Sequence, residues 1–349
     1  MLKCKKGRKI VLPKVNKINS EEFEYTQRKI NQWYFKQTKY FSIITQPFNT
    51  TIIFRDLIIN MVNDNKKILY VWGKNGDNKE LIKSIIKNNK KISYGHIEEG
   101  YIDKDITFIS YKNINNLVEK YDLIIFDDIS TFSMMRKERC RLKIDYLSKY
   151  ADRIIIYSIE KIVVGSETIE ISSIYKNRPF VEPRIIKTRV DLNKDIPYLL
   201  YEYMKWFVDS SNVITLYVPS EEKVDLVCEY YKNKIHIKDA KIIPIYKNED
   251  KNIEYSVSKI KEKTIIIVTS CINKSLDELK SENAIVLFAD DERYTYKKML
   301  YLCGEYRRFN TKLSEILLVT KDENEEIDKL KKIARGYNKK IWDRKSKIF

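Results

Sequence analysis

Short apolar runs alternate with amphipathic segments along most of the chain, beginning near residue 20. In the first half, the apolar runs that predict buried strands are residues 41–44, 67–72, 106–109, 122–126 and 153–157. The segments that predict helices are residues 20–39 with Ser20 as the cap, 51–61, 78–86 and 134–149, with one short helix after residue 109. Strands that are apolar throughout and separated by helices are typical of a mainly parallel sheet with helices on both faces.

The same alternation restarts after a less regular stretch. Residues 162–194 contain Pro179 and Pro183 and lack a clear period, which favours a connection. Beyond it, strands are predicted at residues 213–218, 242–246, 264–268, 284–288 and 316–319, and helices at residues 221–231, 253–261 and 323–335. The sequence therefore predicts an α/β protein with a basic arm (1–19), a first lobe (20–165), a connection (166–194) and a second lobe (195–349) ending in a helix and a basic tail. Two lobes with the same order of elements suggest a cleft between them.

Length and charge add a partner class to this picture. The 349 residues suit two domains, and 43% hydrophobic with 33% charged residues is a globular composition. The net charge is +17, from 66 Lys and Arg against 49 Asp and Glu, and residues 1–19 carry seven basic residues and no acid. Such a field favours polyanions, with nucleic acid as the first candidate and an anionic membrane surface as the second. Compositional drift in an AT-rich genome is the alternative, but drift would raise Glu as well.

Cysteine and histidine usage argues against zinc binding and against histidine-based metal or triad chemistry. The five cysteines and two histidines are scattered: Cys4, Cys140, Cys228, Cys271, Cys303, His96 and His236. This spacing shows no zinc motif and suggests reduced thiols, so we expect no zinc and a cytoplasmic location. No apolar run is long enough to span a bilayer, and no apolar core follows the basic N-terminus as in a signal peptide.

Two acids follow the strand predicted at residues 122–126, where the carboxyl end of a parallel strand meets its ligand. Asp127 and Asp128 are costly to bury unless they are paired or bound to a cation. In nucleotide motors an Asp at this point holds Mg²⁺, and the acid beside it orients the attacking water. The alternative is an ordinary strand exit in which one of the two carboxylates caps the next helix.

The loop at residues 45–51 lies where a phosphate-binding loop is expected, between a strand and a helix. Phosphate loops need glycines and a lysine, and this loop has neither, while Pro47 also removes an N–H donor. Thr50 can still act as a Mg²⁺ ligand, and the helix N-terminus still favours anions. At about 1.5–3 kcal/mol per charged hydrogen bond, the missing groups remove several kcal/mol of phosphate binding, so tight ATP binding is not expected.

Basic residues elsewhere supply candidates for anion contacts. Arg307 and Arg308 follow a predicted helix in the second lobe, from which an arginine can reach a γ-phosphate; a basic surface turn is the alternative. Lys74 and Lys112 follow two first-lobe strands and are placed to hold nucleic-acid phosphates. Trp72 or Tyr111 can stack on bases, or can simply pack in the core.

Taken in order, several segments resemble a superfamily-2 helicase, and most closely the competence-associated DNA-uptake ATPase (ComFA-like) family. The resemblance covers residues 22–338 and rests on EYTQ at 24–27, the loop at 43–51, EL at 80–81, IIFDD at 124–128, RPFVEP at 178–183, YVPS at 217–220, AD at 289–290 and LCGEYRR at 302–308. It implies two RecA-like lobes with Mg·ATP between them and single-stranded DNA across their tops. By position it implies nucleotide contacts and catalysis by Gln46, Asn49, Thr50, Thr51, Asp127, Asp128 and Arg308, with Thr50 and Asp127 as metal ligands.

The sequence departs from the family pattern at the positions that carry the chemistry. The replaced positions are Asn49 for the loop lysine, Gln46 and Phe48 for loop glycines, Asp128 for Glu, residues 158–161 (SIEK) for the linking motif, residues 275–276 (SL) for an Arg-Gly pair, and Glu305 for the first of two arginines, of which only Arg308 remains. The four-cysteine zinc module of the family is reduced to Cys4.

The resulting first hypothesis is a helicase-like, DNA-binding protein of the DNA-uptake type with weak or lost ATP hydrolysis. The second is an active ATP-dependent translocase that tolerates unusual motifs. The third is a non-catalytic docking scaffold in a DNA-processing complex. The expected partners are single-stranded DNA and proteins of the DNA-uptake machinery, and Mg·ATP is the one small-molecule ligand that the resemblance implies.

Overall fold

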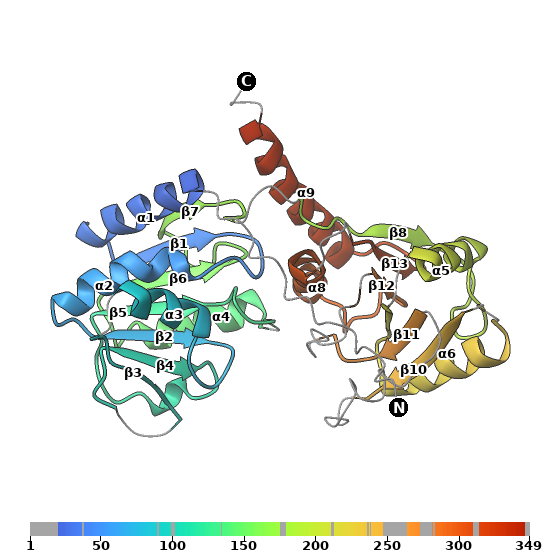
Figure 1. Cartoon of the computed structure of the whole chain (residues 1–349), viewed down its shortest axis with the longest axis horizontal. Helices are drawn as coiled ribbons and strands as arrows, with labels where there is room; N and C mark the ends of the chain where they lie inside the picture. Colours follow the sequence, from blue (N-terminus) through green and yellow to red (C-terminus); the bar gives the residue numbers. More distant parts are fainter. Residues whose placement is uncertain are drawn as a thin grey trace, which may run out of the picture.

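A computed structural model describes residues 20–36, 38–88, 91–98, 102–133, 135–174, 179–210, 213–235, 237, 239–246, 264–272, 281, 283–309 and 314–345. The predicted basic arm at 1–19 and the helix predicted at 253–261 lie outside this part of the chain. The described residues form two lobes that stand side by side in Figure 1, with the first lobe in blue and green and the second in yellow-green to red.

The first lobe is built on a seven-stranded parallel sheet, in the order β3-β4-β2-β5-β6-β1-β7. Its strands are β1 (Tyr40–Ile44), β2 (Ile68–Trp72), β3 (Tyr94–Ile97), β4 (Ile106–Ser110), β5 (Leu123–Asp127), β6 (Ile154–Ser158) and β7 (Glu167–Glu170). Its helices are α1 (Ser20–Phe35), η1 (Ile52–Phe54), α2 (Arg55–Asn63), α3 (Lys79–Asn88), η2 (Ile114–Asn116) and α4 (Lys137–Leu147). The central strands β2, β4, β5 and β6 are buried along their whole length, as their apolar sequences predict.

Side-chain alternation along these strands divides the apolar residues between the two faces of the sheet. In β5, Leu123 and Ile125 pack with the core on the side of α1, α2 and α3, and Ile124 and Phe126 pack on the side of α4. The apolar runs are continuous because both faces are covered, and this is why no polar position interrupts them.

The second lobe repeats this plan with a six-stranded parallel sheet, in the order β10-β11-β9-β12-β13-β8. Its strands are β8 (Arg184–Lys187), β9 (Val213–Tyr217), β10 (Ala240–Ile245), β11 (Thr264–Thr269), β12 (Asn283–Val286) and β13 (Ile316–Thr320). Its described helices are α5 (Tyr198–Ser210), α6 (Glu221–Asn233), α8 (Tyr296–Phe309) and α9 (Glu325–Lys345). Helices α5 and α6 cover one face, and α8 and α9 cover the other.

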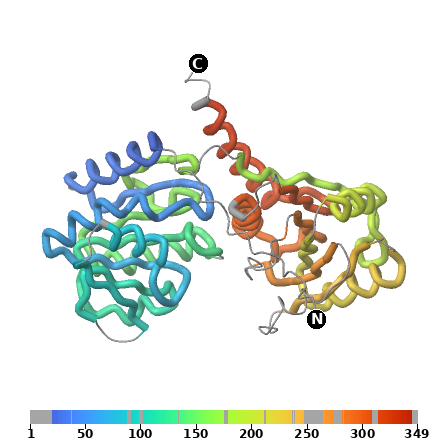
Figure 2. Tube along the Cα trace, in the orientation of Figure 1, coloured from blue at the N-terminus to red at the C-terminus, as the bar shows by residue number. Residues whose placement is uncertain are grey.

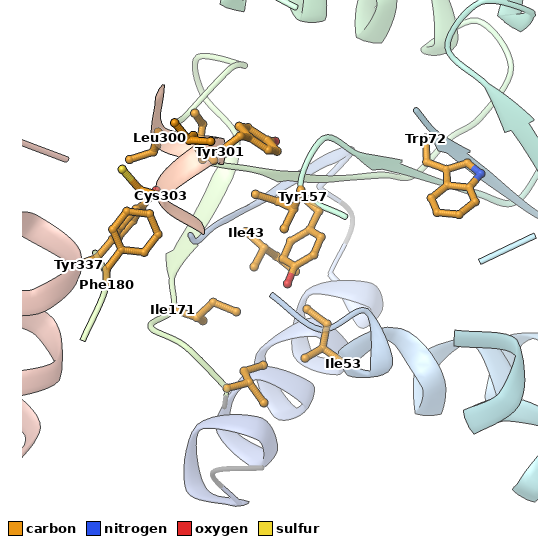
Figure 3. Packing of buried hydrophobic residues seen from close by; sticks show 14 of the residues in the cluster. Ile43, Ile53, Trp72, Tyr157, Ile171, Phe180, Leu300, Tyr301, Cys303 and Tyr337 are labelled. Atoms are coloured by element: carbon orange, nitrogen blue, oxygen red, sulfur yellow. The ribbon is translucent and has the colours of Figure 1, made fainter. Parts of the chain in front are cut away.

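One hydrophobic core runs through the junction of the two lobes. Ile43 and Tyr157 of the first sheet belong to the same buried cluster as Tyr301 and Cys303 of α8 and Tyr337 of α9. Figure 3 shows these side chains together, with α8 and α9 approaching the carboxyl end of β1. The lobes therefore share apolar burial, which ties their relative position to the stability of the whole chain.

Helix α9 bridges the lobes. Its Tyr337 donates a hydrogen bond from its hydroxyl to the Thr45 carbonyl, at 3.2 Å. Its Lys340 pairs with Glu170 of β7. Beyond these contacts, the C-terminal end of α9 extends past both lobes, as the tube in Figure 2 shows.

The structure differs from the sequence-based expectations mainly at the sheet edges. The predicted connection contributes β7 to the first sheet and β8 to the second, so the segment between the sheets is residues 171–183. Both are edge strands with partly exposed side chains, so their short sequences lack a continuous apolar run. The arginine motif was expected after a helix and instead lies inside α8. Strand β3 and helix α5 were not predicted.

Within the described residues, no helix combines the length and the apolar character needed to cross a membrane.

Candidate functional site

The predicted acid pair lies at the carboxyl end of β5, in the middle of the first sheet. Asp127 is fully buried, and its Oδ1 accepts the backbone N–H groups of Ile129 and Ser130 at 2.9 and 3.0 Å. Its Oδ2 accepts the hydroxyl of Tyr70. Burial raises the pKa of Asp127, and these hydrogen bonds offset part of that effect. Both carboxylate oxygens are thus engaged by the first lobe itself.

Asp128 forms a buried ion pair across the junction. Its Oδ2 lies 2.5 Å from Nζ of Lys297 on α8, and the two side chains are 1% and 6% exposed. Its Oδ1 accepts the hydroxyl of Ser133. Lys297 also donates to the Met135 carbonyl at 2.8 Å, so the ammonium is held by two first-lobe acceptors.

Burial and mutual attraction act in opposite senses on this pair. Burial raises the pKa of Asp128, and the Lys297 charge offsets that effect only in part. Burial is the largest single effect on Lys297 and lowers its pKa, but the charge and hydrogen bond of Asp128, together with the nearby Cys140 and Glu160, outweigh burial, so this pKa ends above its ordinary value. Lys297 is therefore an ammonium at neutral pH and supplies the cation that a buried acid at this position requires.

The loop after β1 is organised by Asn49, which stands where the resemblance places a lysine. Its Nδ2 donates to Thr45 Oγ1 at 2.8 Å and to the Ser172 carbonyl at 3.1 Å. Its Oδ1 accepts the backbone N–H groups of Thr50 and Ile174 at 3.0 and 3.2 Å. All hydrogen-bonding positions of this buried amide are used, and they fasten the loop to the segment between the sheets.

The other predicted nucleotide contacts are also buried. Thr50 donates from Oγ1 to Glu80 Oε1 at 2.6 Å and accepts the N–H of Ile52 at 3.2 Å. Gln46 and Thr51 are 2% and 0% exposed. Among the described residues, Gln46 Nε2 and Thr51 Oγ1 find no hydrogen-bond partner.

Helix α8 packs directly against this loop. A Cβ built on Gly304 would lie 2.9 Å from Cβ of Pro47 and 3.2 Å from Cδ2 of Phe48. Phe48 adopts a left-handed backbone with φ of 58°, a conformation that favours glycine, at a position where the resemblance places a glycine. Its ring meets Tyr301 edge-on, with centroids 5.5 Å apart, and its N–H bonds to the Ile129 carbonyl.

These residues, as arranged, do not fit Mg·ATP. Of the two predicted metal ligands, Asp127 is bonded to three donors and Thr50 directs its proton to Glu80. The ammonium of Lys297 occupies the neighbouring carboxylate, and α8 covers the loop that would wrap the phosphates. No hydrolytic step can be derived from this geometry.

The remaining predicted residues lie apart from the acid pair. Lys74 and Lys112 are exposed. They follow β2 and β4, which are neighbours in the sheet, so both lie beyond the carboxyl ends of its strands. Trp72 and Tyr111 are each 8% exposed and pack in the core. Arg308 lies on α8, and its side chain is outside the described part of the structure.

A second polar contact crosses the junction at Glu160, inside the predicted linking motif. Its carboxylate accepts the hydroxyl of Tyr296 and lies 3.6 Å from Nζ of Lys329. The same ammonium lies 3.6 Å from the centroid of the Tyr296 ring. Tyr296 belongs to α8 and Lys329 to α9, so both helices are held to the end of β6.

Sequence reasoning missed Lys297 and Tyr301, the α8 residues that occupy the site. The one available signal was the cost of burying Asp128, which required a cation without identifying it. Helix α8 has an ordinary amphipathic sequence, and nothing in it marks Lys297 among the many lysines of the chain.

No protein-family model matches this chain, and a search of curated proteins gave no match. Solved structures do match. A RecG chain bound to a three-way DNA junction superimposes with a TM-score of 0.53 and 13% identity, over 92% of this chain and 49% of RecG. A variant of S. cerevisiae Dbp5 bound to RNA and ADP-BeF3 gives 0.51 and 12%, over 93% and 92%.

The chain spans about half the length of the RecG chain that it matches. At these identities the likeness concerns the fold, and it confirms the predicted fold class. The chain has two RecA-like lobes, the fold that it shares with these two solved structures.

The ion pair predicts a non-additive mutational cycle. Lys297→Met leaves a buried carboxylate without its cation and should cost about 3–5 kcal/mol of unfolding free energy. Asp128→Asn should be of similar size, and the double variant should lose much less than the sum of the two. Urea unfolding measures all three. Lys205→Met, which breaks an exposed pair with Glu202, is the control and should cost below about 1 kcal/mol. Strictly additive costs would contradict the pairing.

Two helix glycines predict opposite responses to one substitution. Gly304→Ala must displace Pro47 or Phe48 and should destabilise by about 1–2 kcal/mol, because overpacking outweighs the gain in helix propensity. Gly336→Ala on α9 meets no atom within 4 Å and should stabilise by about 0.5–1 kcal/mol. The same urea experiment compares them, and equal effects would rule out close packing of α8 on the loop.

Proposed function

We propose that this chain is a helicase-like protein of the DNA-uptake type that binds single-stranded DNA and does not hydrolyse ATP. The observation that carries the proposal is the Lys297 ammonium on Asp128, which takes the carboxylate that would orient the attacking water. The packing of α8 on the loop after β1 supports it.

DNA binding is supported by charge and by placement. The chain carries a net charge of +17, and Lys74 and Lys112 are exposed at the carboxyl ends of neighbouring strands. The RecG and Dbp5 structures compared above are bound to DNA and to RNA, respectively. Nucleic-acid binding is therefore the property of this fold that the present chain is best equipped to retain.

The assignment to the DNA-uptake type rests on the order of the resembling segments, from residues 24–27 to residues 302–308. A cytoplasmic location accompanies it, since the four described cysteines are buried free thiols.

A docking scaffold is the second candidate, and the shared core favours it. One buried cluster joins both lobes, so the chain offers partner proteins of the uptake machinery a body of fixed shape. An active motor is the least supported candidate. It would require Asp128 to separate from Lys297 and the loop after β1 to separate from α8.

Binding of DNA has a direct test in fluorescence anisotropy with a labelled oligothymidine at several salt concentrations. The affinity should fall as salt rises, because bound lysines release counterions. Lys74→Gln/Lys112→Gln should reduce the slope of log K against log salt by roughly 1.4, or about 0.7 per phosphate contact. A wild-type protein that fails to bind at low salt would sink the proposal.

Loss of hydrolysis has a separate test in phosphate release from Mg·ATP with saturating single-stranded DNA. Wild-type protein and Asp127→Ala should show the same background, since neither has a free acidic site. DNA-stimulated release by the wild type above that of the variant would establish an active motor instead.

A further inference from the structure

The last described helix carries more positive charge than its ion pairs consume. Residues 329–342 of α9 hold six Lys or Arg and no Asp or Glu. Lys329, Lys331 and Lys340 pair with carboxylates of Glu160, Glu323 and Glu170. The other basic residues, Lys332 and Lys339 together with Arg335, which lies 3.6 Å from Glu182, recur at helical spacing and are all exposed.

Trp342 continues the same face, one turn after Lys339. Its side chain is 67% exposed, which is unusual for the largest apolar residue. Spacings of three and four residues place Lys332, Arg335, Lys339 and Trp342 along one side of the helix, over about 15 Å at 1.5 Å per residue. We call these four residues the α9 stripe.

The opposite face of α9 is fully committed to the fold. Ile327, Leu330, Ala334 and Tyr337 are buried in the shared core. The helix is therefore fixed on both lobes and presents the α9 stripe from a rigid support. Figure 1 shows its C-terminal end extending beyond the body of the molecule, where an extended ligand can approach.

The surface beside Gly336, between Arg335 and Lys339, is open. Gly336 lies between Arg335 and Lys339, and a Cβ placed there meets nothing within 4 Å. Arg335 lies 3.6 Å from Glu182, but the arginine side chain is 68% exposed, so this contact holds it weakly. Lys332 and Lys339 form no ion pair with any residue that the structure describes.

From this geometry we infer that the α9 stripe is a binding site for single-stranded DNA. Lys332, Arg335 and Lys339 contact successive phosphates, and Trp342 stacks on a base. Sequence-independent binding of single-stranded DNA requires basic residues along the path of the DNA backbone and an aromatic ring that can stack on any base. The inference rests on the proposed function. It places a DNA contact on α9, away from the carboxyl ends of β2 and β4 where Lys74 and Lys112 lie.

An anionic membrane is the competing polyanion, and the packing of α9 disfavours it. A helix that lies on a bilayer needs a free apolar face to insert. The apolar face of α9 is inside the shared core, and the α9 stripe offers one aromatic residue among cations. Asp328 and Asp343 lie at the two ends of this face. Their carboxylates would repel either polyanion, so they limit the length of helix that a polyanion can contact.

The test measures binding of a labelled oligothymidine to the full chain by anisotropy over a range of salt concentrations. The stripe variant is Lys332→Gln/Lys339→Gln. The matched control is Lys83→Gln/Lys87→Gln, which removes two exposed lysines from α3. The stripe variant should reduce the salt slope by roughly 1.4, and the control should leave it unchanged. Trp342→Ala should weaken binding roughly 5- to 150-fold, while Trp342→Phe keeps most of the affinity.

Each outcome decides between distinct claims. A stripe variant with the wild-type slope and affinity overturns this inference and leaves the proposed function standing. A wild-type chain that does not bind the oligonucleotide at low salt overturns the proposed function itself. If the stripe variant loses binding to phosphatidylglycerol vesicles but keeps DNA affinity, the site belongs to a lipid surface and the inference is wrong. Urea unfolding confirms that every variant is folded.

Discussion

The buried ion pair between Asp128 and Lys297 is the constraint on which the arrangement of the lobes depends. Neither charge is tolerable alone in an apolar junction, so each requires the other in place. The pair sits beside a core that is continuous from β1 to α8 and α9. The ion pair and the burial of apolar side chains therefore favour the same arrangement of the two lobes.

The packing at the junction gives a structural role to two residues that stand where the resemblance expects a lysine and a glycine. Asn49 uses its amide to bond the loop to Ser172 and Ile174, which a flexible lysine cannot do. Phe48 packs on Tyr301, whereas a glycine would leave that ring with Phe132 as its remaining aromatic contact. Asn49 is thus matched to the segment between the sheets, and Phe48 is matched to α8. Both residues contribute to a packed interior at the loop after β1.

The layers of both lobes could be predicted from the sequence, because strands buried on both faces are apolar throughout. The edge strands β7 and β8 could not, since they are short and half exposed. The sequence indicated that Asp128 needs a cation if it is buried, but it did not identify the cation. Lys297 lies 169 residues away, and a single sequence carries no signal for that pairing. Asn49 was recognised as a departure, while its structural role depends on the path of residues 171–174.

The loop after β1 is completed from far along the chain. Tyr337 bonds the Thr45 carbonyl across 292 residues, and α8 covers Pro47 from a similar separation. During synthesis, the first sheet can form long before these helices exist, and the apolar surface around Ile43 of β1 is covered only when they pack on it. Contacts of such high order slow folding and prolong the exposure of apolar surface. The nascent chain therefore passes through a stage in which the first lobe is folded but α8 and α9 do not yet cover it. At that stage a chaperone has the most apolar surface to protect.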